Sequence, residues 1–337
     1  TYIDISAIDR EERSIRNPQR LPGIDAPSRA RQRLAADDVI VSTVRPNLNT
    51  VAGVTTEHAS AIASTGFCVL RAKPTKLDSR YLLHWISSEK VVAKLVSLAT
   101  GATYPAVSDK VIKSLPFDPP LYPEQRRVSA ILDKADALRR KRQEAIRVAA
   151  EFVRSTFADM FGDPHTNARS LPTASLGEVA KLKSGDFLPS HEMAGAGDVL
   201  VYGGNGINGR HDRAMFDEVK LVIGRVGAYC GAVHLTKPRS WVTDNALYVS
   251  ALDPRLRLEY LAFALTQANL NQYSSQSGQP LVSASRLYPV EIILPPLGLQ
   301  DEFLTVLNHS RVVQSTQEES LVEVERLFGS LSTELLA

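Results

Sequence analysis

The sequence predicts an α/β (α+β) protein with an internal two-fold repeat: two mixed α/β domains separated by two long antiparallel coiled-coil-like helices. The main observation is that Pro119-Pro120-Leu121 and Pro295-Pro296-Leu297 each precede a long helical stretch. Upstream of each stretch lies a segment of similar texture, so the repeat is about 175 to 180 residues long, far above solenoid periods. Such a chain is suited to measuring the distance between two sites.

Composition narrows the possible classes of protein. The 337 residues give room for two domains, and the hydrophobic content of 44% is ordinary for a globular chain. No apolar run is long enough to span a bilayer, and no signal peptide is visible. The 2 cysteines are expected to be buried thiols, which points to a reducing cytoplasm. A net charge of +2 means that any anion binding must come from local patches or be shared with partners.

Residues 119–163 are expected to form the first helical spacer. Apolar residues recur mostly three and four positions apart, which is typical of a helix-packing seam. Pro123 suits a helix start, and Gly162 followed by Asp163-Pro164 suits a stop. At 1.5 Å per residue the helix would be about 55 Å long. The residues expected in this seam are Val128, Ile131, Leu132 and Leu138.

Residues 295–337 are expected to form the second helical spacer, antiparallel to the first. A polar middle from Gln314 to Ser320 makes its helical pattern the weaker of the two. The residues expected in its seam are Leu307, Leu321, Val324 and Leu327. On the first helix, the basic run Arg139 to Arg142 has two readings, a solvated helix face or a contact to nucleic acid or an acidic partner.

Two globular domains precede these helices, at residues 1–118 and 164–294. Strands are predicted at 38–44 and 67–70 in the first domain, and at 219–224 and 246–249 in the second. Helices are predicted at 81–98 and 259–272. Nothing before Tyr2 resembles the segment 175–185, so we expect the first strand or two of the first domain to be missing.

The glycine-rich segment 203–209 admits several interpretations. A phosphate-binding loop would need a helix directly after it, and a new strand follows Arg210-His211-Asp212-Arg213 instead. A Gly/Asn hairpin is the plain alternative. The third reading is a turn whose Asn and Arg side chains enter a DNA groove, where Asn pairs with adenine and Arg with guanine.

No catalytic constellation is visible in the sequence. Asp118-Pro119-Pro120-Leu121 resembles the Asp-Pro-Pro-Tyr signature of adenine methyltransferases, but no cofactor-binding strand end precedes it. The 7 histidines lie at no metal-ligand spacing with cysteines or carboxylates. No serine or cysteine lies in a nucleophile-elbow context. We therefore expect a non-catalytic chain without a metal.

Several motifs together resemble one family. They are the run from Pro119 to Val128 that continues into Ile131-Leu132-Asp133-Lys134-Ala135-Asp136, the ending Asp159 to Pro164, the opening Tyr2 to Asp9, and the loop Tyr202 to Ile207. They look like the specificity subunits of type I restriction–modification systems, over essentially the whole chain. The second helix departs from the family pattern, because Gly298-Leu299-Gln300-Asp301-Glu302 stands where a Glu-Gln-Arg-like run is usual.

The resemblance implies a function and a set of partners. Two target-recognition domains would each read half of a bipartite double-stranded DNA site, and the helices would set the gap between the halves. Two modification subunits would bind S-adenosylmethionine and methylate adenine. Restriction subunits would use ATP and Mg²⁺ to cut unmodified DNA in defence against phage. This chain would hold none of these cofactors.

DNA-reading residues are expected on the loops of both domains. In the first they are Thr43, Arg45, Asn47, Asn49, Thr103 and Tyr104. In the second they are Lys183, Tyr202, Asn205, Asn208, Arg210, Arg225 and Tyr229. Pro46 is expected to hold Arg45 extended and outward; the alternative is a surface ion pair with Asp37.

Two rival functions come from other classes of protein. One is an adaptor with two sugar- or peptide-binding domains on a helical spacer. The other is a stand-alone nuclease or methyltransferase, against which the missing motifs argue. Binding that weakens steeply with salt would separate DNA recognition from sugar binding.

Overall fold

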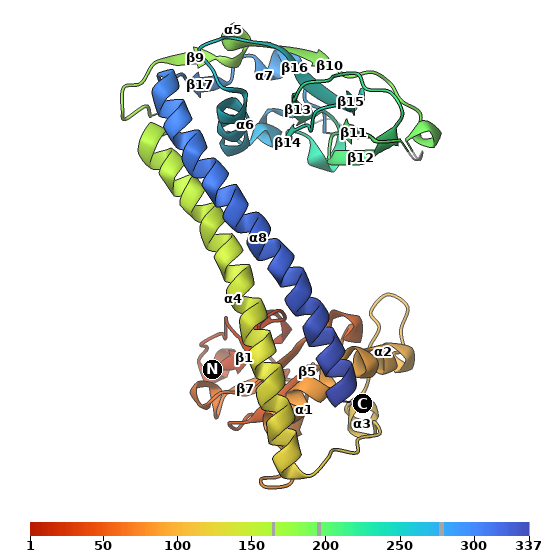
Figure 1. Cartoon of the computed structure of the whole chain (residues 1–337). Coiled ribbons are helices and arrows are strands. Elements are labelled where there is room, and N and C mark those ends of the chain that lie inside the picture. The colour runs from red at the N-terminus through yellow and green to blue at the C-terminus, as the bar shows by residue number, and fades with distance from the viewer. Residues whose placement is uncertain (164–165, 194–196, 276–279, 337) are drawn as a thin grey trace. The chain divides into compact units, whose positions relative to one another are not determined.

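The computed structural model describes residues 1–163, 166–193, 197–275 and 280–336 (Figure 1). The chain divides into two compact units. Unit 1 comprises Thr1–Ile146 and Ser315–Ala337, and unit 2 comprises Arg147–Gln314. Each unit therefore contains one globular domain, the beginning of one long helix and the end of the other.

The domain of unit 1 contains two three-stranded sheets and a hairpin. The first sheet has the order β1-β7-β4, the second is antiparallel with the order β6-β5-β8, and β2 pairs with β3. The elements are β1 (Tyr2–Ile3), β2 (Ile8–Asp9), β3 (Ser14–Ile15), β4 (Ala30–Arg33), β5 (Asp38–Ser42), β6 (Val51–Gly53), β7 (Ile62–Ser64), β8 (Phe67–Arg71), α1 (Ser79–Ile86), α2 (Glu89–Leu98) and α3 (Asp109–Lys113). Short 3-10 turns are η1 (Ile5–Ala7), η2 (Gly23–Asp25), η3 (Pro46–Leu48) and η4 (Thr56–His58).

Strand β5 is buried on both faces, which explains its continuous apolar sequence. Side chains alternate across a strand. Ile40 therefore packs into one core, with Ala52 and Phe67. Val39 and Val41 pack into the other core, which includes residues of α1 and α2. The strand predicted at 38–44 is confirmed for Asp38–Ser42.

The domain of unit 2 repeats this plan with one more strand in its main sheet. That sheet is antiparallel with the order β10-β16-β13-β14, a second sheet has the order β12-β11-β15, and β17 pairs with β9. The elements are β9 (Thr173–Ser175), α5 (Leu176–Val179), β10 (Ala180–Ser184), β11 (Val199–Gly203), β12 (Gly206–His211), β13 (Leu221–Gly224), β14 (Val233–Leu235), β15 (Ser240–Val242), β16 (Ala246–Leu252), α6 (Leu258–Gln267), α7 (Ala284–Leu287) and β17 (Glu291–Ile293). Its 3-10 turns are η5 (Ser190–Glu192), η6 (Gly227–Tyr229) and η7 (Leu270–Tyr273).

The same alternation recurs in unit 2, which confirms the internal repeat. Strand β13 sends Leu221 and Ile223 into the main core and Val222 into the second core. Strands β13, β14 and β16 thus correspond to β5, β6 and β8. Strand β10 pairs with the outer edge of β16, whereas the same edge of β8 pairs with no strand among the described residues.

The two long helices pack antiparallel in each unit, as the sequence predicts. They are α4 (Tyr122–Phe161) and α8 (Leu297–Leu335). In unit 1 the buried Val128 and Leu132 of α4 pack with Leu336, and further along Arg142 Nη1 donates to Gln317 Oε1 (2.7 Å). In unit 2 Phe303 of α8 packs against Phe157 and Phe161 of α4.

The packed face of these helices differs from the expected seam at two residues. Leu138 is 41% exposed and Leu327 is 52% exposed, so neither lies in a buried seam. Each residue turns a helix by about 100°. Leu138 comes two residues after the buried Asp136, and Leu327 comes one residue before Phe328, which packs in the seam.

The other expected seam residues lie at or near the packed face. Val128, Leu132, Leu307 and Val324 are buried. Ile131 and Leu321 are partly buried. The polar middle of the second helix does not interrupt it, since α8 is continuous from Leu297 to Leu335.

A buried glutamine near the start of each long helix fastens that helix to its domain. Gln125 Nε2 donates to the carbonyl oxygens of Lys76 (3.1 Å) and Pro120 (2.8 Å). Its Oε1 accepts the N–H of Asp78 (2.8 Å), the N-cap residue of α1. All of this amide's hydrogen bonds are therefore made to backbone groups.

Gln300 makes the same set of contacts in unit 2. Its Nε2 donates to the carbonyl oxygens of Arg255 (2.7 Å) and Pro295 (2.8 Å). Its Oε1 accepts the N–H of Arg257 (2.8 Å), the N-cap residue of α6. The departure from the family pattern around Gln300 therefore leaves this fastening intact.

Two arginines of the basic run on α4 bond to a buried carboxylate, while Lys141 of the same run is exposed to solvent. Asp136 is 2% exposed and accepts hydrogen bonds from both Arg139 and Arg140. Arg139 Nη2 also donates to the carbonyl of Glu11 (2.6 Å). Arg139 therefore ties the helix to the domain of unit 1, whereas the bonds to Asp136 lie within α4.

Candidate nucleic-acid interface

The turn after β5 holds Arg45 in an unusual backbone conformation. Its φ of 50° and ψ of 63° lie in the left-handed region, which costs a non-glycine residue about 1 kcal/mol or more. The Arg45 N–H donates to the carbonyl of Pro105 (2.7 Å). The expected extended conformation before Pro46 is therefore wrong, because this hydrogen bond and the following turn η3 favour the left-handed one. Strain of this kind is often found at functional sites.

The side chain of Arg45 lies over the ring of Tyr104. Its guanidinium carbon is 5.0 Å from the ring centroid, within the range of a cation–π contact. Both side chains are exposed, Tyr104 at 66%. No ion pair joins Arg45 to Asp37 in the part of the chain that the structure describes. The structure thus brings together two residues that the sequence placed on separate loops.

The remaining predicted residues of unit 1 divide into exposed and inward-facing groups. Asn47 and Thr103 are exposed beside Arg45 and Tyr104 in the sequence. The Thr43 hydroxyl donates to the carbonyl of Gly66 (2.9 Å). Asn49 Nδ2 donates to the carbonyl of Ser87 (2.8 Å). Thr43 and Asn49 therefore stabilise the turn, and their side-chain donors are not free to read a base.

The glycine-rich segment of unit 2 is a β-hairpin. Strands β11 and β12 are antiparallel, and Gly203 pairs with Gly206 around the two-residue turn Gly204-Asn205. Gly206 has a φ of 86°, which a side chain rarely adopts. Asn205, Asn208 and Arg210 are exposed on this hairpin. The plain hairpin reading is correct for the backbone, and the exposed polar side chains leave the groove-reading hypothesis open.

Tyr202 does not belong among the exposed residues of the hairpin. Its side chain is 4% exposed and packs in a core with Val222 and Tyr248. Its hydroxyl accepts the N–H of Lys237 (3.0 Å). The expectation that Tyr202 contacts DNA is therefore wrong, since its ring packs in the core below the hairpin strands.

Arg225 lies after β13, close to the hairpin. The carbonyl oxygen of Asn245 lies between the two: it accepts the Arg225 N–H (3.0 Å), and it is close to Gly204 of the hairpin turn. A Cβ added to Gly204 would be 3.2 Å from this oxygen. The Arg225 guanidinium donates to the hydroxyl of Ser184 (3.3 Å), a residue to which the sequence reading gave no role. Lys183 is exposed next to Ser184. Tyr229 is 54% exposed on the turn η6.

The turns after β5 and β13 are equivalent in the two units. Val44 bridges Ala106, and Val226 bridges Leu281. Two hydrogen bonds then match, because Arg45 N donates to Pro105 O and Gly227 N to Pro280 O. Arg225 therefore corresponds to Thr43 and not to Arg45. Equivalent turns thus present different side chains in the two units.

His234 packs against the hairpin on its buried side. A Cβ on Gly206 would lie 3.5 Å from His234 Cε1. Burial lowers the pKa of His234 below the usual value for histidine. The imidazole is therefore neutral at pH 7 and adds no positive charge to this surface.

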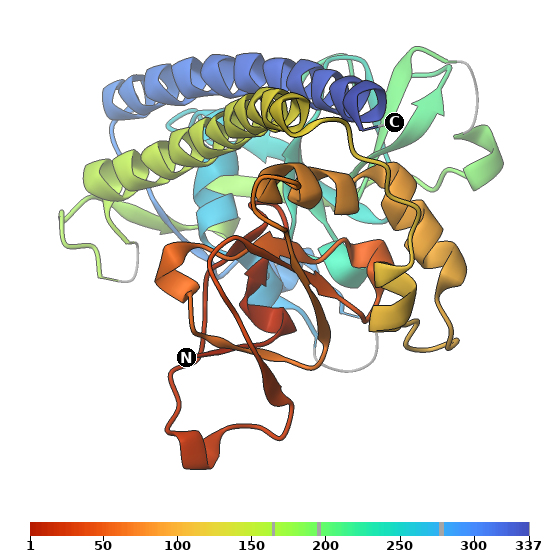
Figure 2. The same cartoon turned by 90° about the horizontal axis from the view of Figure 1, so that it is seen from below.

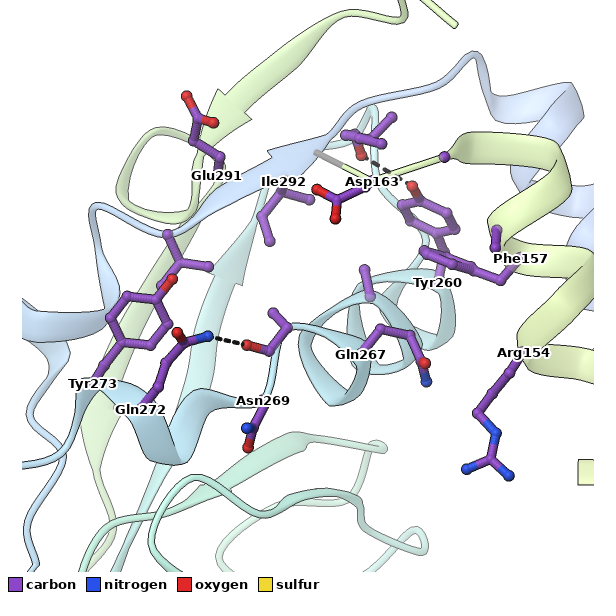
Figure 3. A pocket seen from close by; sticks show the side chains of 16 residues that line it. Arg154, Phe157, Asp163, Tyr260, Gln267, Asn269, Gln272, Tyr273, Glu291 and Ile292 are labelled. Atoms are coloured by element: carbon purple, nitrogen blue, oxygen red, sulfur yellow. Dashed lines mark hydrogen bonds between the residues drawn. The ribbon is translucent and has the colours of Figure 1, made fainter. Parts of the chain in front are cut away.

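A cavity of about 510 Å³ lies in unit 2 beside α6, β17 and the end of α4 (Figure 3). The Tyr260 hydroxyl donates to the carbonyl of Ile293 there (3.0 Å), and burial raises the pKa of this phenol. A cavity of about 610 Å³ in unit 1 lies beside Tyr81, Trp85 and Phe117. Neither cavity is lined by a predicted DNA-contact residue, so we assign neither to DNA reading.

Neither a metal-binding cluster nor a membrane-spanning helix is found among the described residues. No three His, Cys, Asp or Glu side chains of the described ranges are grouped so that they could hold a metal ion. No helix in these ranges has the length and apolar content needed to cross a membrane.

Comparison with known proteins gives one consistent result. The family model described as "Type I restriction modification DNA specificity domain" matches residues 31–148 and 172–325. The specificity subunit of the Escherichia coli type I restriction enzyme EcoprrI is 31% identical over 160 residues, which is 46% of this chain and 39% of that protein. The match thus spans about two fifths of that curated relative's length.

Two solved structures are similar over most of the chain. One, from a study of complex assembly and conformational transition of the type I R-M system, is 25% identical with a TM-score of 0.58, covering 99% of this chain and 90% of that one. The other is the S subunit of a type I restriction–modification system from M. genitalium. It is 15% identical with a TM-score of 0.62, covering 90% of this chain and 84% of that one, and shows likeness of fold.

Proposed function

The chain belongs to the family of type I restriction modification DNA specificity domains, and on that premise we propose that it reads a bipartite DNA site within a type I restriction–modification complex. Unit 1 reads one half-site and unit 2 reads the other. The observation that carries the proposal is that equivalent turns on one repeated core carry different exposed side chains. Those are Arg45 in unit 1 and Tyr229 in unit 2.

The exposed side chains have the chemistry of base recognition. Arg45 can donate two parallel hydrogen bonds to guanine, and Asn205 and Asn208 can pair with adenine. Arg210 and Lys183 are long exposed cations that suit phosphates as well as bases. Arg225 is partly buried and anchored on Ser184, so its reach is short and its orientation fixed.

The functional division of the chain follows the internal repeat. We infer that residues 1–118 and 164–294 are target-recognition domains, and that residues 119–163 and 295–337 are spacers. The spacers set the number of unread base pairs between the half-sites. The exposed Leu138 and Leu327 are available on these helices for contact with other subunits.

Chemistry in the complex belongs to other subunits. Two modification subunits would bind S-adenosylmethionine and methylate adenine, and restriction subunits would use ATP and Mg²⁺. This chain would recognise DNA without catalysing a reaction. Because the DNA that it would bind, chromosomal or invading, is in the cytoplasm, we infer that the chain acts there. The family model that matches the chain supports DNA recognition over the rival adaptor with sugar- or peptide-binding domains.

Selection from random duplexes tests the proposal. The chain would be purified together with its modification subunits and incubated with a library of random double-stranded DNA. We expect two short invariant sequence blocks separated by a constant gap, with binding that weakens steeply with salt. Enrichment of a single block, or of no sequence at all, would contradict a bipartite reading.

A further inference from the structure

The connection between β3 and β4 in unit 1 is a loop whose residues Leu21 to Arg29 are all exposed. Gln19 and Tyr2 exchange two backbone hydrogen bonds at its start (2.8 and 2.9 Å), and Arg29 accepts the N–H of Thr65 at its end (2.9 Å). Between them Ile24 is 93% exposed, on the turn η2. Figure 2 shows this loop, in red near the end marked N, extending away from the strands that it connects.

The loop contains backbone hydrogen bonds of its own and exposes its large apolar side chains, Leu21 and Ile24. Asp25 N donates to Pro22 O (3.0 Å), and Ala30 N donates to Pro27 O (2.8 Å). Each proline fixes its own φ and reduces the conformational freedom of the unbound loop. A loop restricted by prolines loses less entropy when it contacts a partner than an unrestricted one.

Positive charge is concentrated on this loop and the strand after it. Residues 16–33 contain five arginines and one acidic residue, Asp25. The arginines are Arg16, Arg20, Arg29, Arg31 and Arg33, and all five are exposed. Arg16 pairs with Glu12, and Arg31 Nε donates to Ser28 O (2.7 Å). For Arg20, Arg29 and Arg33, no side-chain partner is found within the described residues. This surplus contrasts with the chain's net charge of +2.

Backbone hydrogen bonds connect this loop to the turn that carries Arg45. Arg29 accepts the N–H of Thr65, and the next residue, Gly66, accepts the N–H of Thr43 (2.9 Å). Thr43 lies two residues before Arg45. The loop and the Arg45–Tyr104 pair therefore lie at the same edge of unit 1.

Among the residues of unit 2 that the structure describes, there is no equivalent of this charged loop. The parallel pair β11–β15 of unit 2 corresponds to the parallel pair β1–β7 of unit 1. In unit 1 the strand β4 also pairs with β7, and in unit 2 the single residue Phe216, which bridges Ser240 of β15, takes the place of β4. The short connection from His211 to Phe216 carries one arginine, Arg213, and one acid, Asp212. The charged loop is therefore a feature of the first domain alone.

We propose that the loop from Gln19 to Arg29 binds the phosphate backbone of the DNA that carries the first half-site, through Arg20 and Arg29, together with Arg33 on the adjoining strand β4. Guanidinium groups bind phosphates without regard to sequence. The loop therefore supplies affinity and salt dependence, whereas Arg45 supplies base preference. This inference rests on the proposed function, because it takes DNA recognition by unit 1 as given.

A charge-neutralising pair of variants tests the loop. The change Arg20→Gln/Arg29→Gln is made in the full chain, assembled with its modification subunits. The dissociation constant is measured for a cognate duplex and a scrambled duplex at several KCl concentrations. Each lost phosphate contact lowers the slope of log K against log salt by about 0.9, so we expect the slope to fall by about 2. Both duplexes should weaken by the same factor.

Lys73→Gln/Lys76→Gln is the matched control. It removes the same charge from exposed residues that follow β8. In the register of β5 with β8, Ser42 pairs with Phe67 at the proposed DNA edge and Asp38 pairs with Arg71 at the far end. The two lysines therefore lie beyond the far end, and their loss should leave the slope unchanged.

The possible outcomes separate the two proposals. If the unaltered complex prefers no duplex, the proposed function fails. If it binds its site but Arg20→Gln/Arg29→Gln behaves like the lysine control, the loop inference alone is overturned. It is also overturned if the arginine variant fails to assemble with the modification subunits, because the loop would then contact an acidic protein surface. A loss confined to the cognate duplex would make the loop a base reader and contradict phosphate binding.

Discussion

Arg45 is strained, exposed and in contact with an exposed aromatic ring. A left-handed arginine persists only because Pro105 and the turn η3 fix its backbone. The ring of Tyr104 limits where the guanidinium can point. Both features orient the side chain in advance of binding, which reduces the entropy lost when it meets a base.

We predict that Arg45→Ala weakens binding to the cognate site by about 1–3 kcal/mol and relaxes specificity at one base pair of the first half-site. Tyr104→Ala should weaken binding less, because an exposed cation–π contact contributes about 0.5–1 kcal/mol. Tyr104→Phe keeps the ring and serves as the control. Titration of the assembled complex with single-base variants of the site measures all three. Unchanged binding and preference in Arg45→Ala would remove this residue from the interface.

Asp136 is the buried carboxylate that organises the arginines of α4. Burial alone would raise its pKa, but hydrogen bonds from Arg139 and Arg140 outweigh burial and lower the pKa overall. A carboxyl whose pKa is lower in the folded chain stabilises the fold at pH values above its unfolded pKa. That stabilisation is lost as the pH falls through the folded value.

Asp136→Asn should therefore cost about 2 kcal/mol at pH 7, since it removes a buried carboxylate that pairs with two partly buried guanidinium groups. The difference from the unaltered chain should shrink below about pH 4, near the unfolded pKa of aspartate. Urea unfolding at a series of pH values measures this. Glu151→Gln, in the exposed pair with Arg147, is the control and should change stability by less than about 1 kcal/mol. A difference that persisted or grew with acidification would contradict the assignment.

Residue-level expectations failed where a side chain's direction depends on long-range contacts. Tyr202 and Asn205 are three residues apart in one loop motif, yet the first is buried and the second exposed. Asn49 turns inward because the carbonyl of Ser87 accepts its amide. Leu138 fits the apolar spacing, but Asp136 occupies the buried face. Composition and spacing carry no information on such distant partners.

Among the elements, the two long helices are fastened to their domains in the same way. Gln125 and Gln300 are 1% and 0% exposed, and each satisfies three backbone groups. Each joins the N-cap of a domain helix to the proline-containing segment before the long helix. The repeated contact sets where each helix begins relative to its own domain.

We predict that Gln125→Leu and Gln300→Leu each lower the free energy of unfolding by about 3 kcal/mol or more, because each leaves three backbone groups unpaired. Chemical denaturation followed by circular dichroism measures the effect. Gln267→Leu, at an exposed position of α6, is the control and should be close to neutral. If either buried glutamine could be replaced without loss, the fastening would not stabilise that unit.

Element predictions succeeded where the sequence pattern is local and strong. The strand predicted at 67–70 is observed as Phe67–Arg71 and that at 246–249 as Ala246–Leu252. The helix predicted at 81–98 is two helices, α1 and α2, because Ser87 and Ser88 bond back to carbonyls of α1. The continuous helix α8 shows that packing can override a polar middle segment.

For the whole molecule, duplication explains both the constant and the variable parts. The strands, the buried glutamines and the helix pair recur in both units. The exposed turns differ: unit 1 has Arg45 with the arginine-rich loop, and unit 2 has the Gly/Asn hairpin. The sequence alone predicted the repeat and the family, because both are recognised from the order of residues along the chain. It could not predict which loop residues share a surface.

The central claim is that each unit reads its own half-site, and methylation mapping of the hairpin variant tests it most directly. Asn205→Ala/Arg210→Ala would be expressed with the modification and restriction subunits, and methylated adenines would be mapped by long-read sequencing of host DNA. We predict that sequence preference relaxes at the second half-site only, with the first half-site and the gap unchanged. Full discrimination at the second half-site, or relaxation at the first, would contradict the account.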